Sequence, residues 1–161
     1  MASVSHALPW AHEPVPELTE KLGSRIERML ATVHPDTPCD RFNWLLTPMS
    51  AIFFPQDPHT HTASALQNVM TRLRTSPERA GELLWIRVER QTLSRLPDTN
   101  AVAFSIHTYS DPLSSIATDM ASLRGMLTLL QTYSPQRLRY SEMEQIKDCA
   151  ILWLEFAIER G

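Results

Sequence analysis

The sequence predicts an α+β domain, and three changes in residue spacing point to it. Apolar residues recur at three- and four-residue steps over 17–33, as they do on one face of a helix. Between 83 and 109 the spacing changes to the alternation that is typical of strands. Helical spacing returns after Ser110 and continues towards Gly161. A chain of 161 residues fits one domain, which we expect over 17–161 behind an extended arm of residues 1–16.

The first half of the chain is expected to hold two helices and two strands. Pro9, Pro14 and Pro16 keep the arm out of a helix interior, and His34-Pro35 ends the helix of 17–33. Strands are predicted over 41–47 and 50–54, separated by Pro48. A loop is then expected over 55–61, followed by a helix over 62–74.

The second half begins with a predicted hairpin. Strands over 83–95 and 101–109 flank the turn-forming run 96–100, so we expect them to pair in an antiparallel way. A short helix over 112–118 and longer helices over 119–131 and 141–159 are predicted to follow. The helices of 17–33 and 143–158 should pack against the sheet or each other.

Composition excludes several classes of protein. The chain is 43% hydrophobic and 20% charged, with a formal net charge of −3, so a globular protein without affinity for nucleic acid is expected. No apolar stretch is long enough to span a membrane and no secretory signal is visible, so we expect a cytoplasmic location. Cys39 and Cys149 lie in no metal-binding spacing and should be free thiols. Covalent c-type haem attachment and nucleotide-binding glycine loops are likewise excluded.

Arg90 is the most informative single residue of the predicted hairpin. Alternation places it on the same strand face as Leu84, Ile86 and Val88. Burying a guanidinium among aliphatic side chains is unfavourable unless the charge is paired. We therefore expect a buried Arg90 with an anionic partner, the alternative being that it lies at the strand end and reaches water.

Three motifs resemble the family of haem-dependent oxidative N-demethylases. The first is His12-Glu13-Pro14-Val15-Pro16, and the second is Arg41-Phe42-Asn43-Trp44. The third runs from Arg87-Val88-Glu89-Arg90-Gln91-Thr92-Leu93 to Arg95-Leu96-Pro97 and continues through Phe104, Ile106, Thr108-Tyr109 and Pro112-Leu113. Order and spacing both agree with the family over residues 10–140. His107, where the family usually has arginine, and Arg139-Tyr140-Ser141 depart from the pattern.

The resemblance implies a PAS-like sheet, non-covalently bound haem b, and oxygen-dependent demethylation of a small secondary amine such as dimethylamine, with release of formaldehyde. Electrons would come from a separate flavin and iron–sulfur reductase. His12 would be the axial iron ligand, and His107 is the alternative candidate. Arg41, Arg87 and Arg90 would contact the cofactor or its propionates, and Trp44 would pack on the macrocycle. The catalytic residues themselves are not identified.

Other interpretations remain open for these residues and for the whole chain. Trp44 could be a core residue, Arg41 a surface residue, and Arg87, Glu89 and Arg90 an ion-pair network that rigidifies the hairpin. His34 could be a helix cap, and His59 and His61 a solvated pair. The resemblance extends to only the C-terminal half of a family member. A short, non-catalytic PAS-like domain that binds a ligand or serves as a partner subunit is therefore the alternative, and we expect weak or no demethylation by the isolated chain.

Overall fold

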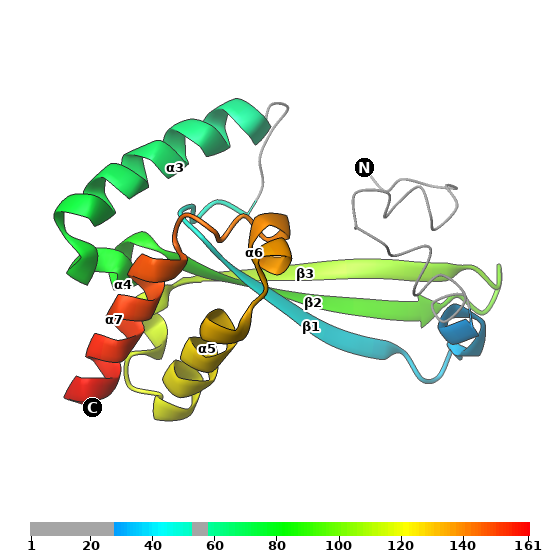
Figure 1. The fold of residues 1–161 in the computed structure, drawn as a ribbon. Coiled ribbons are helices and arrows are strands. Elements are labelled where there is room, and N and C mark those ends of the chain that lie inside the picture. The colour runs from blue at the N-terminus through cyan, green and yellow to red at the C-terminus, as the bar shows by residue number, and fades with distance from the viewer. Residues whose placement is uncertain (1–27, 53–57) are drawn as a thin grey trace. The chain divides into compact units, whose positions relative to one another are not determined.

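The structure is a computed structural model that describes residues 28–52 and 58–161. Within those residues the chain folds as α+β, with one sheet and several helices, as the residue spacing predicts. The sheet has three strands in the order β1-β2-β3 (Figure 1). Their bounds are Cys39–Thr47 for β1, Trp85–Arg95 for β2 and Val102–Pro112 for β3.

In the described part of the chain, two helices lie between β1 and β2 and three follow β3. They are α3 (Pro58–Thr75), α4 (Ala80–Leu83), α5 (Met120–Thr132), α6 (Pro135–Tyr140) and α7 (Lys147–Arg160). Short 3₁₀ turns precede α4 and follow β3, over Pro77–Arg79 and Leu113–Ile116. Residues 28–32 form the described end of a further helix, while the rest of the predicted 17–33 helix and the arm of 1–16 lie outside the described residues.

The chain divides into two compact units. The first comprises residues up to Arg41 together with Gln91–Ile106, and the second comprises Phe42–Arg90 and His107–Gly161. Each strand therefore contributes residues to both units. Helices α3 to α7 all belong to the second unit.

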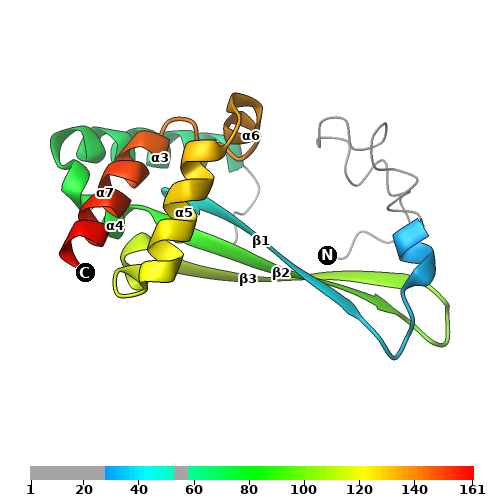
Figure 2. The same cartoon turned by 60° about the horizontal axis from the view of Figure 1, so that its bottom comes forward.

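The second unit holds the hydrophobic core. Packing of α5 on α7 is visible in Figure 1 and Figure 2, and the short α4 packs on both α7 and the 3₁₀ turn after β3. Large side chains from the strands and the helices close this core. Its largest fully buried side chains are those of Leu46, Leu73, Leu84, Leu113, Leu123, Leu130, Met143, Ile146 and Leu154.

Gly81 makes a close contact inside this core. The indole of Trp153, on α7, lies directly against the Cα of Gly81 on α4, so a Cβ built there would meet the ring. Both residues are buried. Any larger side chain at this position would therefore have to displace the tryptophan.

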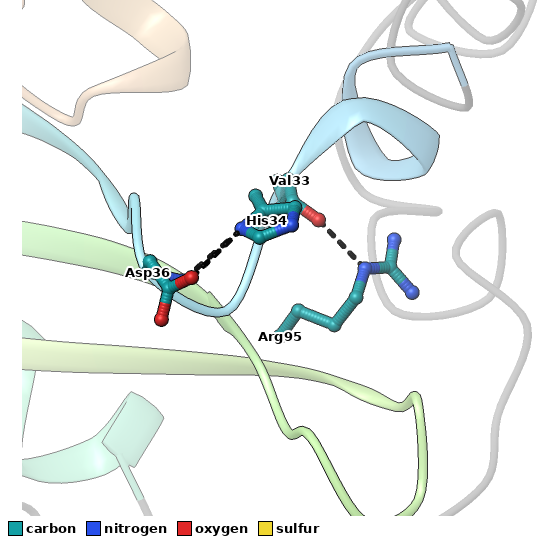
Figure 3. A network of polar contacts seen from close by, with 4 residues as sticks. All are labelled: Val33, His34, Asp36 and Arg95. Carbon is teal, nitrogen blue, oxygen red and sulfur yellow. Dashed lines mark hydrogen bonds and ion pairs between the residues drawn. The ribbon is translucent and has the colours of Figure 1, made fainter.

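The first unit is organised around Arg95, near the end of β2 (Figure 3). Its Nε donates to the carbonyl of Val33 at 2.6 Å and its Nη2 to the carbonyl of Leu30 at 2.5 Å. Its Nη1 donates to the carbonyl and the side-chain oxygen of Asn100, at 2.8 and 3.0 Å. One guanidinium thus joins the carbonyl end of the helix of residues 28–32 to the hairpin turn.

The same view shows how the chain leaves that helix. The imidazole Nδ1 of His34 lies 3.5 Å from the carboxylate of Asp36 (Figure 3). Both side chains are largely exposed. The helix-end position of His34 agrees with its interpretation as a cap, and the contact contributes little to stability.

The predicted hairpin is confirmed, although β2 begins at Trp85 rather than at 83, and β3 continues to Pro112 rather than ending at 109. The Leu96 N–H donates to Ala101 O at 2.8 Å, and the Asn100 N–H donates to Leu96 O at 2.9 Å. Asn100 closes the turn with φ of 55°, a conformation that asparagine adopts more readily than most residues.

Three predicted boundaries are wrong. Residues 50–52 form no strand, since the Met49 N–H turns back to Thr47 Oγ1 at 3.3 Å, and residues 53–54 lie outside the described part. Residues 58–61 are helical rather than loop, because proline is favourable in the first turn of α3. The C-terminal helix begins at Lys147, not at 141.

The last boundary is set by the end of α6, which the residue spacing did not predict. The N–H groups of Ser141, Glu142 and Met143 donate back to carbonyls of α6. Glu142 takes φ of 56° in this closure. The chain therefore turns before α7, and residues 141–146 cannot belong to that helix.

Asp119 caps the N-terminus of α5. Its carboxylate accepts hydrogen bonds from the N–H groups of Ala121 and Ser122, at 3.0 and 3.2 Å, and from Ser122 Oγ at 2.7 Å. The hydroxyl of Ser122, its backbone N–H and that of Ala121 lower the pKa of Asp119 below 3.8. Its stabilising contribution is therefore complete above pH 3.8 and is lost as pH falls through the lower, folded-state pKa.

We expect Asp119→Ala to lower the melting temperature at neutral pH, because two N–H groups of α5 lose their acceptor. The difference from the parent should shrink as the pH falls below 3.8. Thermal melts followed by circular dichroism at several pH values would test this. A difference that is the same at pH 7 and at pH 2.5 would contradict the charged cap.

The cysteines are free, as predicted, and differ in environment. Cys39 is exposed at the start of β1, whereas Cys149 is half-buried on α7. Burial, with a smaller contribution from the charge of Asp148, raises the pKa of the Cys149 thiol. A thiol-specific reagent should therefore modify Cys39 before Cys149 at neutral pH.

Candidate functional site

The register of β2 and β3 decides which predicted site residues share a face. Leu96 pairs with Ala101 at one end of the hairpin, and the Leu113 N–H donates to Leu84 O at 2.8 Å at the other. The two strands contain equal numbers of residues between these pairs, so the register runs without a bulge. His107 therefore lies opposite Arg90, and Tyr109 opposite Val88.

Two side-chain contacts give the register of β1 on β2. Arg41 Nε donates to Gln91 Oε1 at 2.6 Å, and Thr92 Oγ1 donates to Asp40. From Asp40 to Arg41 the residue number rises by one on β1, while the number of the contacted residue on β2 falls by one. This is the pattern of antiparallel strands. Continued along β1, this register places Phe42 opposite Arg90 and Trp44 opposite Val88.

One face of the second unit's sheet consequently gathers aromatic, basic and imidazole side chains from all three strands. We call this group the aromatic shelf. Phe42 is 67% exposed and Tyr109 is 45% exposed, and both Arg90 and His107 are exposed. The rings of His107 and Tyr109 lie 4.6 Å apart at 50°. The members of the aromatic shelf are Phe42, Trp44, Arg90, His107 and Tyr109.

The aromatic shelf begins where the helical cover ends. On the same sheet face and further along β1, Leu46 is 2% exposed, and its N–H lies 3.2 Å from the sulfur of Met143. Leu84 is completely buried and Ile86 packs against the core. Trp44 is half-buried at the boundary between the covered and the open part of the face.

Arg90 is exposed, so the prediction that it is buried is wrong. Leu84 and Ile86, which share its face, belong to the core or pack against it, whereas Arg90 and Phe42 lie beyond it. Arg90 therefore reaches solvent, which avoids the cost of burying its charge. The alternation in β2 correctly predicts which strand face carries Arg90. It does not indicate how far the helices of the second unit extend over that face.

Arg41 and Arg87 point to the opposite face. Arg41 is bound to the side chain of Gln91. Arg87 Nε lies 3.7 Å from Glu89 Oε1, and Arg87 Nη2 donates to Ile52 O at 3.4 Å. An ion pair within the hairpin, one of the two sequence-based interpretations of Arg87, is thus present.

The six residues named from the sequence therefore separate into three groups. Trp44, Arg90 and His107 share the aromatic shelf. Arg41 and Arg87 lie on the other face, and His12 lies outside the described residues. Phe42 and Tyr109 were not named as site residues, although the predicted hairpin and its alternation could have found Tyr109.

The donor set of the aromatic shelf can hold a flat, anionic cofactor. An imidazole offers one neutral nitrogen to a metal, a guanidinium suits a carboxylate, and aromatic rings pack on a planar macrocycle. In the described part of the chain, no cluster of three or more histidine, cysteine or acidic side chains could bind a metal ion. A haem needs no such cluster, since its porphyrin supplies the equatorial nitrogens and the protein only axial ligands.

Two further observations bear on the class of protein. Within the described ranges, no helix has both the length and the hydropathy needed to cross a bilayer. Compared with models of known families, residues 2–151 match the family described as haem-dependent oxidative N-demethylase, alpha subunit-like.

Proposed function

The chain belongs to the haem-dependent oxidative N-demethylase, alpha subunit-like family, and from this we propose that it binds haem b on the aromatic shelf. The observation that carries the proposal is the convergence of Trp44, Arg90 and His107 on one open sheet face. The reaction we propose is the oxygen-dependent demethylation of a small secondary amine such as dimethylamine, with formaldehyde as the second product. A separate flavin and iron–sulfur reductase would supply the electrons.

When bound, the haem would supply the iron centre at which oxygen is activated. The residues of the chain would bind and orient it. His107, or His12 from the N-terminal motif, would give an imidazole nitrogen to the iron, and Arg90 would pair with an acidic group at the rim. Trp44 and its aromatic neighbours would cover part of one planar surface and keep water from it.

The two histidines are supported by different observations. His12 belongs to the family's proline-flanked element, and Pro14 and Pro16 restrict the chain just after it. His107 lies on the aromatic shelf, with its ring against Tyr109. In our proposal His12 remains the first choice of ligand, and His107 is the alternative. A PAS-like fold is part of the same proposal.

A non-catalytic role is the second candidate. Phe42 is 67% exposed beside Arg90, so this part of the aromatic shelf is open to solvent. An open apolar face suits a domain that binds a small ligand or a partner subunit as well as it suits an enzyme. In that case the chain would bind no haem, or would bind it without turnover.

Titration of the purified chain with haemin tests the proposal. We expect a Soret band that shifts when carbon monoxide is added to the reduced protein. One of the variants His12→Ala and His107→Ala should lose or shift this band, because it removes the axial nitrogen. His34→Ala is the matched control, since His34 is exposed and lies off the aromatic shelf, and it should leave the band unchanged.

Two results would overturn parts of this proposal. A chain that stays colourless after haemin supplementation would favour the non-catalytic role. An identical band in both histidine variants would show that the iron ligand is neither residue. With haem bound, formaldehyde release from dimethylamine in the presence of a suitable reductase would test the reaction itself.

A further inference from the structure

Trp44 is held from the side by residues that follow α5. The rings of Trp44 and Tyr133 are stacked, with centroids 6.1 Å apart and planes 28° apart. The guanidinium carbon of Arg137 lies 5.1 Å from the centroid of the same Tyr133 ring. Tyr133 therefore contacts both Trp44 on the aromatic shelf and the guanidinium of Arg137 on α6.

The local fold fixes the backbone of both Tyr133 and Arg137. Ser134 caps α6, its hydroxyl accepting from the Arg137 N–H at 3.2 Å, and Pro135 occupies the first turn. Leu138 anchors the helix in the core at 6% exposure. Tyr133 ends α5, its N–H bound to Leu129 O at 3.0 Å. Neither residue can move far without disturbing these bonds.

The guanidinium of Arg137 is used differently from two other exposed guanidinium groups of the second unit. Arg139 lies 3.8 Å from the carboxylate of Glu144, and Arg79 lies 2.9 Å from that of Glu82. The printed sequence gives no acidic residue within six positions on the N-terminal side of Arg137. Arg137 is exposed, and its guanidinium lies over the Tyr133 ring.

We infer that Tyr133 and Arg137 complete the aromatic shelf: Tyr133 is a positioning residue for Trp44, and Arg137 binds a carboxylate of the ligand that lies on Trp44. The inference rests on the proposed function and goes further, because it requires a ligand that is both planar and acidic. Stacking on the ring leaves the flat fork of the guanidinium pre-oriented for two-point contact with a carboxylate. Little side-chain freedom would then be lost on binding.

The two roles can be tested with a pair of porphyrins that differ only in their acids. Haemin carries two free propionates, and haemin dimethyl ester carries none. We expect Arg137→Met to weaken haemin binding on the order of tenfold and to change binding of the ester less than twofold. Arg124→Met, at an exposed arginine on α5, is the matched control and should affect neither porphyrin.

The positioning role has a readout without any cofactor. Tyr133→Leu should change the near-ultraviolet circular dichroism that arises from Trp44, which is identified by subtracting the spectrum of a Trp44→Phe variant. Tyr133→Phe keeps the ring and should preserve the signal. It should also retain haemin affinity. Tyr133→Leu should weaken both porphyrins, and haemin more than its ester, because Arg137 also loses the ring on which its guanidinium is stacked.

The possible negative results distinguish the two roles from each other and from the proposed function. Equal weakening of haemin and its ester by Arg137→Met would overturn the carboxylate contact. An unchanged Trp44 signal in Tyr133→Leu would overturn the positioning role, whether or not haem binds. Absence of porphyrin binding by the unmodified chain would instead refute the proposed function, and with it the role of Arg137.

Discussion

Gly81→Ala is expected to lower the free energy of unfolding by about 3 kcal/mol. The added Cβ would overlap Cε2 of Trp153, well inside van der Waals contact. Both residues are buried in a core that also fixes α4 and α7, so the ring cannot keep its present position beside an added Cβ. Either the ring leaves its preferred rotamer or the two helices separate.

Gly125→Ala is the matched control for this substitution. Gly125 lies in α5, and a Cβ built there meets nothing within 4 Å. Because glycine is a poor helix former, this change should stabilise the protein by up to about 1 kcal/mol. Chemical denaturation of both variants would give the two free energies with opposite signs.

A double-mutant cycle isolates the proposed contact. In a Trp153→Leu background the ring is absent, so Gly81→Ala should cost much less than in the parent. An unchanged cost in that background would show that the loss comes from elsewhere than the indole.

Arg95→Met should destabilise the chain by about 2–3 kcal/mol. The substitution keeps an apolar stem of similar length and removes all the donors that reach Leu30, Val33 and Asn100. The two helix-end carbonyls lie in a partly buried setting and would lose a charge-assisted hydrogen bond each. Denaturant unfolding monitored by circular dichroism would measure the loss.

Arg79→Met provides the comparison for Arg95. Arg79 pairs with Glu82 at 2.9 Å, but both side chains are about half exposed or more. A pair of this kind contributes little, so the change should stay below about 0.5 kcal/mol. Equal effects of the two substitutions would mean that the contacts of Arg95 are no more valuable than a surface ion pair.

Residue spacing predicted those parts of the fold whose pattern is local. The hairpin was predicted because alternation, a turn-forming run and a second alternating run follow one another within 30 residues or so. α5 was placed within one residue at each end, where Asp119 gives a cap and Leu123 and Leu130 face the core. The short α6 was missed, although Ser134-Pro135 is a helix-start signal.

The candidate site was harder to predict because its exposure is set by distant parts of the chain. Alternation placed Arg90 on the face of Ile86 and Val88, and motif resemblance brought Trp44 and His107 into the same list. Whether that face is covered depends on α5 to α7, which are remote from it in sequence. The partner of Trp44, Tyr133, lies almost 90 positions away, and no local pattern joins the two.

The strand order carries a consequence for the time course of folding. β2 and β3 are adjacent in sequence and meet at a tight turn, so their pairing closes a very short loop and can form within microseconds. β1 joins the other side of β2 through contacts such as Arg41–Gln91, which are separated by 50 positions. Closing that longer loop costs more chain entropy. We therefore expect the hairpin to form first and β1 to dock late, which would make the assembly of Trp44 with Arg90 and His107 a late step in reaching the native state.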